Sequence, residues 1–354
     1  MPDALLLTAD PALHDVVARC AAAAGVGLEP CADPAEALAR WSAAPLVLVD
    51  AAAAAALTAL VPGRRDGVHV VSRGRVADEV FRLAVGLGAE TVSDLEHAEG
   101  WLMEQLTDLG DHARPPGLVV GVLGGSGGAG ATTLAVALGQ VGARRAPALL
   151  VDADPLGPGL DRLVGLERRH GARWEALCHT TGRLSARALR DAVPRQGRLG
   201  VLTWGPGEAG ELPGSTVREA VSAARRGHDL VVVDLPRVLD AAARDVLVRC
   251  DRLVVVVSPT LVGVAAAARV CARSAGTVAP VLVVRRPATG PVLSDREVAA
   301  ACRHPVVVSM PSQRGLAESV DLGLGPVRSP RSPLARAART LHDQLGAAAG
   351  SACA

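Results

Sequence analysis

A glycine-rich stretch near the middle of the chain constrains the fold more than any other feature of the sequence. It reads GVLGGSGGAGATTLA from Gly121 to Ala135 and follows the apolar run Leu118–Val120. Glycines let the backbone turn sharply and approach a phosphate closely, and the free N–H groups at a helix N-terminus attract anions. The stretch therefore predicts a strand, a phosphate-binding loop and the start of a helix.

The motif G-x-x-x-x-G-K-[ST] predicts which loop residues would contact a bound nucleotide. Thr132 or Thr133 would offer a hydroxyl to Mg²⁺. The motif requires a lysine at position 131, where this chain has alanine. The chain has no lysine, so its 37 basic residues are all arginines. The alternative interpretation is a glycine turn that binds nothing. The candidate cofactor-binding residues are Gly125, Ser126, Gly127, Gly128, Ala129, Gly130, Ala131, Thr132 and Thr133.

Three aspartates follow predicted strands of the same region. Asp152 and Asp154 come after the apolar run Ala148–Val151, and Asp234 ends another apolar run ahead of a proline. Because ligands of open α/β sheets bind at the carboxyl ends of the strands, these carboxylates are expected beside the glycine loop. Thr132, Asp152 and Asp234 are the candidate Mg²⁺ ligands, and Asp154 is the candidate for orienting an attacking water. Alternatively, Asp154 caps a helix.

The first hundred residues alternate short aliphatic runs with helical segments, the pattern of a small parallel sheet. Helices are expected to begin near Pro11, Pro34, Ala51, Ala77 and Glu96. The expected strands are Ala4–Thr8, Gly27–Pro30, Leu46–Asp50, Val68–Ser72 and Glu90–Val92.

Composition narrows the class of protein. A formal net charge of +1 and an aromatic content of 1% give no support for a nucleic-acid partner. The N-terminus does not have the basic start of a signal peptide, and no apolar run is long enough to span a bilayer, which predicts a soluble cytoplasmic protein. In the last segment, Leu334, Leu341 and Leu345 form a narrow apolar stripe, which favours packing on the domain over membrane binding.

The larger part of the chain resembles the MinD/ParA family of deviant Walker A ATPases, over roughly residues 118–325. The family loop falls on Ser126–Thr133, its V-D-x-D motif on Val151–Asp154 and its switch II aspartate on Asp234. Ser126 and Ala131 replace the two family lysines. The resemblance implies a P-loop NTPase-like parallel sheet with helices on both faces, ATP and Mg²⁺ as cofactors, and a homodimer. Arg285 and Arg286 stand where the family has a purine-contacting asparagine.

The N-terminal part resembles the receiver domain of response regulators, a flavodoxin-like fold. Asp50 falls on the phospho-acceptor position and Ser72 on the Ser/Thr position. Asp10 is displaced from the acidic cluster of receivers, and Ser93 or Asp94 replaces the lysine. Asp50 is therefore interpreted as a vestigial acceptor and helix cap in a pseudo-receiver used for docking.

The expected organisation has four parts. They are a degenerate receiver-like domain over 1–111, a linker over 112–117, the MinD/ParA-like domain over 118–326, and a C-terminal connector and helix over 327–354. A receiver fused ahead of such a domain resembles the CpaE-like branch and its actinobacterial septum-site-determining members.

Three functions follow from these resemblances. The first is a regulatory scaffold for septation or Flp/tad pilus machinery, with weak or absent ATP turnover. Such a scaffold would be recruited to the septum or pole by partner proteins rather than by direct membrane binding. The second is an active Mg-ATP switch in which an arginine, with Arg237 as the nearest candidate, replaces the lysines. The third is a response regulator phosphorylated on Asp50.

Overall fold

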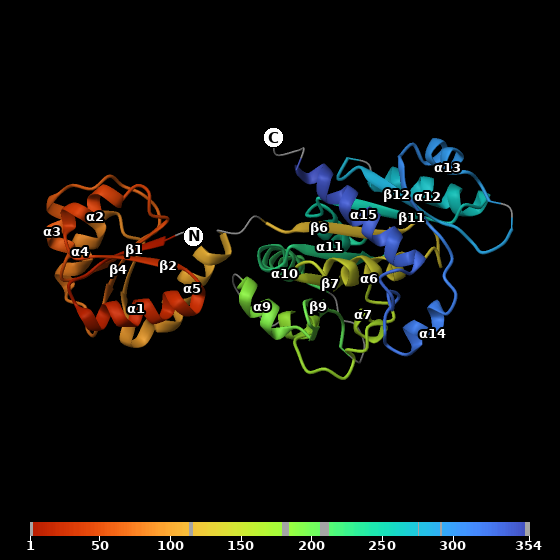
Figure 1. The fold of residues 1–354 in the computed structure, drawn as a ribbon. Coiled ribbons are helices and arrows are strands. Elements are labelled where there is room, and N and C mark those ends of the chain that lie inside the picture. Colours follow the sequence, from red (N-terminus) through yellow and green to blue (C-terminus); the bar gives the residue numbers. More distant parts are fainter. Residues whose placement is uncertain are drawn as a thin grey trace. The chain divides into compact units, whose positions relative to one another are not determined.

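The chain forms two compact units, Met1–Pro115 and Pro116–Ala354, which are described separately (Figure 1). The computed structural model describes residues 3–112, 116–178, 184–205, 212–274, 276–290 and 292–350.

The smaller unit is a five-stranded parallel sheet with the order β2-β1-β3-β4-β5. Each strand lies within two residues of its predicted position. The strands are β1 (Asp3–Leu7), β2 (Gly27–Cys31), β3 (Leu46–Asp50), β4 (Val68–Ser72) and β5 (Thr91–Asp94). The helices are α1 (Pro11–Ala24), α2 (Pro34–Arg40), α3 (Ala54–Ala59), α4 (Asp78–Leu87) and α5 (Leu95–His112).

Helices cover both faces of this sheet. One core contains side chains of α1 and α5, and the opposite core contains side chains of α2, α3 and α4. Local sequence sets the ends of α1, because Asp10 caps its first turn, Pro11 fits its first position and Gly25 adopts the left-handed conformation at its end.

The larger unit is an eight-stranded sheet with the order β13-β12-β11-β6-β10-β7-β9-β8, parallel except for β8. The strands are β6 (Leu118–Gly124), β7 (Ala148–Asp152), β8 (Arg195–Gln196), β9 (Leu199–Leu202), β10 (Leu230–Leu235), β11 (Arg252–Val257), β12 (Pro280–Arg285) and β13 (Val306–Met310). The helices are α6 (Ala131–Gly142), α7 (Leu160–Leu163), α8 (Trp174–Cys178), α9 (Ala186–Ala192), α10 (Gly214–Gly227), α11 (Ala241–Leu247), α12 (Leu261–Ser274), α13 (Asp295–Cys302), α14 (Leu316–Asp321) and α15 (Pro333–Gly350).

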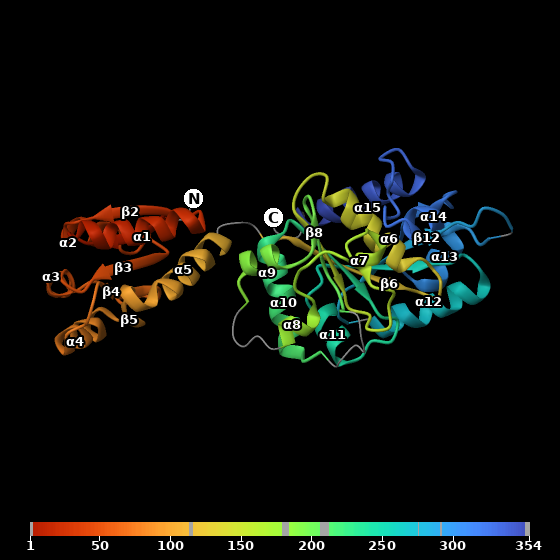
Figure 2. The same ribbon diagram turned by 90° about the horizontal axis from the view of Figure 1, so that it is seen from below.

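Two layers of helices enclose the larger sheet. Figure 2 shows α6 and α15 on one side of it and α10, α11 and α12 on the other. The strands in the middle of the sheet are almost entirely aliphatic and fully buried, as expected for a parallel sheet covered on both faces. Within the described part of the chain, no helix is long and apolar enough to cross a membrane.

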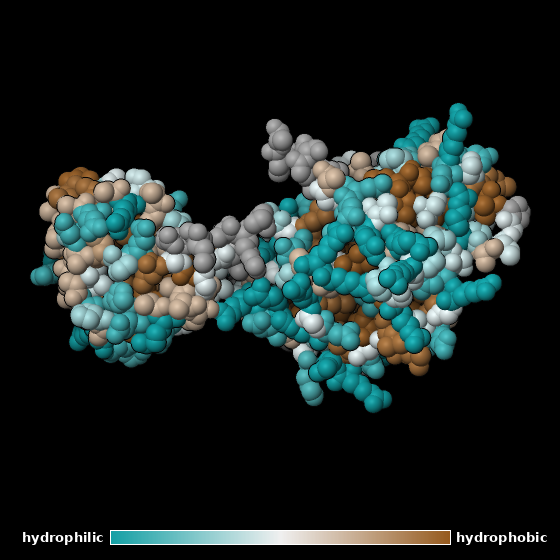
Figure 3. Space-filling model, viewed as in Figure 1, coloured by the Kyte–Doolittle hydropathy of each residue, from teal (hydrophilic) through white to brown (hydrophobic). Residues whose placement is uncertain are grey.

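The helix α15 packs along α6. Its buried residues include Leu334, Leu341 and Leu345, the three leucines of the predicted stripe. Figure 3 shows hydrophilic side chains spread over the outer surface of the larger unit where this helix lies in Figure 1. The apolar face of α15 is thus part of the core.

Candidate functional site

The glycine loop connects β6, between β10 and β11 in the sheet, to the first turn of α6. Gly128 and Gly130 have positive φ angles of 69° and 95°, a conformation that a side chain disfavours. Gly125 is required for a different reason, since a Cβ atom there would lie 2.6 Å from the Cβ of Ala267. The predicted strand, loop and helix are therefore present, and the loop opens at the N-terminus of α6.

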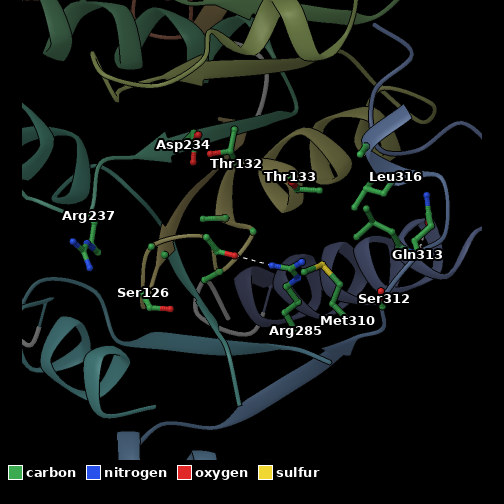
Figure 4. A pocket seen from close by; sticks show the side chains of 18 of the residues that line it. Ser126, Thr132, Thr133, Asp234, Arg237, Arg285, Met310, Ser312, Gln313 and Leu316 are labelled. Carbon is green, nitrogen blue, oxygen red and sulfur yellow. Dashed lines mark hydrogen bonds between the residues drawn. The ribbon is translucent and has the colours of Figure 1, made fainter. Parts of the chain in front are cut away.

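A pocket of about 710 Å³ lies over this loop, which is enough for a nucleotide-sized ligand. Its wall includes Asp154 and Pro311. Figure 4 shows Asp234 and Arg237 on one side and Arg285 with Met310, Ser312 and Gln313 on another. Of the nine candidate cofactor-binding residues, eight line the pocket. They are Ser126, Gly127, Gly128, Ala129, Gly130, Ala131, Thr132 and Thr133.

Asp234 is the buried carboxylate of this pocket. Its side chain accepts a hydrogen bond from Thr132, and the two labelled side chains face one another in Figure 4. Burial, helped by the nearby carboxylates of Asp152 and Asp154, raises the pKa of Asp234 to about 7, although the hydrogen bond from Thr132 opposes the shift. A cation bound here would relieve the buried charge. Thr132 and Asp234 thus offer two oxygen ligands, and Mg²⁺ fills its other positions with water and phosphate oxygens.

Asp152 is the neighbour of Asp234 in the register of β7 and β10, but it does not line the pocket. Its Oδ2 atom accepts hydrogen bonds from the Thr203 hydroxyl at 2.7 Å and the Leu160 N–H at 3.2 Å. Burial raises the pKa of Asp152 to about 6 although these hydrogen bonds oppose the shift. Asp152, one of the three predicted Mg²⁺ ligands, therefore holds the chain after β7 in place and is not part of the pocket wall that Thr132 and Asp234 share.

Asp154 lines the pocket and also accepts a hydrogen bond from the N–H of Leu156 at 3.0 Å. The predicted water-orienting residue thus faces the loop while it holds a turn. Across the described residues, no cluster of three or more His, Cys, Asp or Glu side chains has the arrangement of a metal site.

Arginines supply the cations of the pocket. Arg237, the predicted candidate, lines it. Arg285, at the end of β12, donates a hydrogen bond from Nη1 to the carbonyl oxygen of Gly128 at 2.7 Å (Figure 4). Arg286 donates instead to the carbonyl of Leu293 and pairs with Asp295.

Sequence reasoning missed the contact of Arg285 with the loop. Its position directly after a strand of the same parallel sheet was a usable signal, because such residues gather at the edge where the loop lies.

In the smaller unit, Asp50 ends β3 and has both carboxylate oxygens engaged. The Thr8 hydroxyl donates to Oδ2 at 2.6 Å, and the N–H of Ala52 donates to Oδ1 at 3.0 Å. Asp10 caps α1, and Asp94 accepts a hydrogen bond from the N–H of Gly74. Asp50 and Asp10 thus both hold local backbone in place, Asp50 after a strand and Asp10 at the start of a helix.

Comparison with known proteins gives matches to each unit and to nearly the whole chain. Residues 7–117 match the family described as Rv3660c-like, CheY-like N-terminal domain. The protein Rv3660c of Mycobacterium tuberculosis H37Rv is 40% identical over 348 residues, which cover 93% of this chain and 94% of that protein.

Two solved structures are similar to the fold. A ParA family ATPase from Chlorobium tepidum TLS matches with a TM-score of 0.57 and 19% identity, covering 64% of this chain and 99% of the other. The septum site-determining protein MinD of Pyrococcus horikoshii, solved with Mg-ADP, matches with a TM-score of 0.55 and 19% identity, covering 66% of this chain and 97% of the other. The predicted combination of a CheY-like domain with a P-loop ATPase fold is therefore confirmed. From its likeness to Rv3660c over nearly its whole length, this chain belongs to the Rv3660c family.

Proposed function

We propose that this protein is a regulator of the cell-division or partition type that acts mainly through protein contacts and turns over ATP slowly or not at all. The observation that carries the proposal is a phosphate loop with the required backbone shape and a hydroxyl–carboxylate pair, in which Ala131 and Ser126 stand at the lysine positions. The likeness of the fold to MinD of Pyrococcus horikoshii, a septum site-determining protein, supports the cell-division role.

The missing lysines define the chemistry that we expect. A charge-assisted contact to phosphate contributes about 1.5–3 kcal/mol, so the loss of two such contacts weakens both binding and turnover. The remaining loop N–H groups, together with Thr132 and Asp234, would still hold the phosphates of Mg-ADP or Mg-ATP. We propose that nucleotide, if bound, changes the shape or dimerisation of the protein without being its substrate.

The finer assignments belong to the same proposal. They are a CpaE-like role at the septum or at a Flp/tad pilus, a cytoplasmic protein recruited to the septum or pole by partners, a homodimer, and the four-part organisation with boundaries at 111, 117 and 326. The receiver-like domain would serve as a docking module, with Asp50 as its structural carboxylate.

Restoring the lysine tests the proposal directly. We expect Ala131→Lys to tighten Mg-ATP binding by the full-length protein at least about tenfold, measured by isothermal titration calorimetry. Ala131→Met is the matched control, because it adds length without charge and should leave the affinity near that of the wild type. Equal tightening by both variants would show that charge is not what the loop lacks. Wild-type single-turnover hydrolysis well above ~10⁻⁴ s⁻¹ that is lost in Asp154→Ala would refute slow turnover.

A second candidate, the active Mg-ATP switch, is favoured by one specific observation. Arg285 donates to the loop carbonyl of Gly128, and Arg237 lines the same pocket, so two guanidinium groups could supply the missing positive charge. In that case Arg285→Ala and Arg237→Ala should each abolish hydrolysis that the wild type performs. Unchanged hydrolysis in both variants would exclude these arginines as replacements for the lysines.

A further inference from the structure

A second pocket, of about 690 Å³, lies between α12 and the segment that runs from the end of β10 into α11. It touches Gly125, the first glycine of the loop, and shares Arg237 with the loop pocket. Apart from Gly125 and Arg237, its lining residues have no role in the proposed function. Its lining residues are Gly125, Arg237, Val238, Leu239, Arg244, Ala266, Arg269, Val270, Ala272 and Arg273.

Positive charge gathers on this pocket without compensation. Arg237, Arg244, Arg269 and Arg273 line it, all four are exposed, and no carboxylate belongs to the lining. Among the described residues, none of the four guanidinium groups has an ion-pair or hydrogen-bond partner. Most other arginines of the larger unit do find partners, as Arg218 pairs with Asp245 close by. An anionic group placed here would therefore meet free donors, and guanidinium binds carboxylate through paired hydrogen bonds.

The same surface carries exposed apolar side chains. Val238 on the rim is 70% exposed and Val262 at the start of α12 is 81% exposed. Val262, Ala266, Arg269 and Arg273 are spaced by four, three and four residues, so they lie on one face of α12. This face has two apolar residues in the first half and two arginines in the second, over about 16 Å of helix.

We propose that this arginine pocket is the docking site for an acidic peptide segment of a protein partner, one that also carries aliphatic side chains. A small anion would engage the guanidinium groups but leave Val238 and Val262 in water. Nucleic acid fits the lining less well, because apolar residues separate the arginines and the pocket has no aromatic side chain for base stacking. A carboxylate-rich helix or strand with apolar residues satisfies both halves of the face.

The arginine pocket lies next to the loop pocket but does not depend on it. Arg237 lines both, so a segment docked at the arginine pocket would sit against the cation of the nucleotide pocket. The proposal holds whether or not the loop binds ATP, and its test contains no nucleotide.

The test uses a defined probe with the full-length protein. A fluorescein-labelled peptide of sixteen residues, made of Glu, Ala and Leu with leucines spaced by four, is titrated by fluorescence anisotropy in physiological salt. We expect saturable binding, weakened at least about tenfold by Arg269→Glu combined with Arg273→Glu, since two charge-assisted contacts become repulsive. Val262→Ser should weaken peptide binding severalfold. A peptide in which Ser replaces Leu should bind the wild-type protein more weakly by a similar factor. The combination of Arg168→Glu with Arg169→Glu, at exposed arginines away from this pocket, is the matched control and should bind as the wild type does.

Three outcomes would overturn the proposal. They are the absence of saturable binding, equal binding by the pocket and control double variants, and displacement of the peptide by a short DNA duplex or by inorganic pyrophosphate as readily as by unlabelled peptide. Thermal unfolding of each variant verifies that the fold is kept, and Val262→Ser, a change at an exposed site, remains informative if the double variant fails to fold.

Discussion

The buried carboxylate of Asp234 should make the larger unit less stable at neutral pH than its core packing would allow. Only 4% of this residue is exposed, and its pKa is raised to about 7 in the folded protein. An aspartate in an unfolded chain titrates near pH ~3.9. The folded state therefore holds a proton that the unfolded state has lost, and the free energy of unfolding falls as pH rises from about 4 to 7.

The magnitude follows from the difference between the two pKa values. About three pKa units correspond to about 4 kcal/mol, reached above pH 7, of which about half is already present at pH ~5.5. Asp234→Asn removes the ionisation and can still accept the Thr132 hydrogen bond. We expect this variant to be more stable than the wild type, with an advantage that grows by about 2 kcal/mol between pH ~5.5 and ~8.

Pulse proteolysis in urea at the two pH values measures this advantage, because peptides of the larger unit report its unfolding separately. Asp152→Asn is the comparison variant. The pKa of Asp152 is raised only to about 6, so its advantage should grow by only about 1 kcal/mol over the same pH range. Its carboxylate also accepts three hydrogen bonds, which an amide cannot all accept, and their loss should offset this gain. If Asp234→Asn shows no stability advantage at pH ~8, then ionising Asp234 does not lower the free energy of unfolding. The reasoning would then be wrong. Mg-ADP should narrow the gap by stabilising the wild type alone.

Four further predictions concern other parts of the chain. Burial lowers the pKa of His228 to about 4, so between pH 6.5 and 4 the unfolded state binds a proton that the folded state does not. The free energy of unfolding should therefore fall by about 3 kcal/mol as the pH drops over this range. His228→Gln should reduce this pH dependence, measured by urea unfolding at acid pH. Leu341→Ala should cost about 2–5 kcal/mol in urea unfolding, whereas the exposed Thr340→Ala should change stability by less than about 0.5 kcal/mol. Gly125→Ala should destabilise the larger unit by about 1–3 kcal/mol in the same assay, because its methyl group would overlap Ala267, while Gly127→Ala, in open space, should not. Acetyl phosphate should leave the mass and the amide NMR spectrum unchanged, because both oxygens of Asp50 accept hydrogen bonds; a phosphorylated Asp50 would contradict this.

Much of the fold could be predicted because its strands are dense aliphatic runs that stop at polar residues. The strand β10, for example, is Leu230–Leu235 and ends beside Pro236, and β3 ends at Asp50 as expected. The strand β8 was missed, because Arg195 and Gln196 have no apolar pattern. The helix α7 is short and ends at Leu163, because Val164 leaves helical geometry and Gly165 turns left-handed.

The candidate site was harder to predict than the fold. The loop, Thr132 and Asp234 follow from motif spacing, and the structure brings them to one pocket. The inward position of Asp152 depends on Thr203, which lies 51 residues away, and the contact of Arg285 with Gly128 spans 157 residues. Such contacts are set by tertiary packing, so the local sequence pattern does not predict them.

The helix α15 has a practical consequence for work on this protein. It begins at Pro333 beside Leu334, a residue of the loop pocket, and its buried face lies along α6, the helix that the glycine loop opens. Trimming the chain before this helix would strip apolar cover from α6 and remove part of the pocket wall in one cut. Shortened versions made to simplify binding assays should therefore keep α15 whole, and a loss of nucleotide affinity in a truncated protein would say nothing about the glycine loop itself.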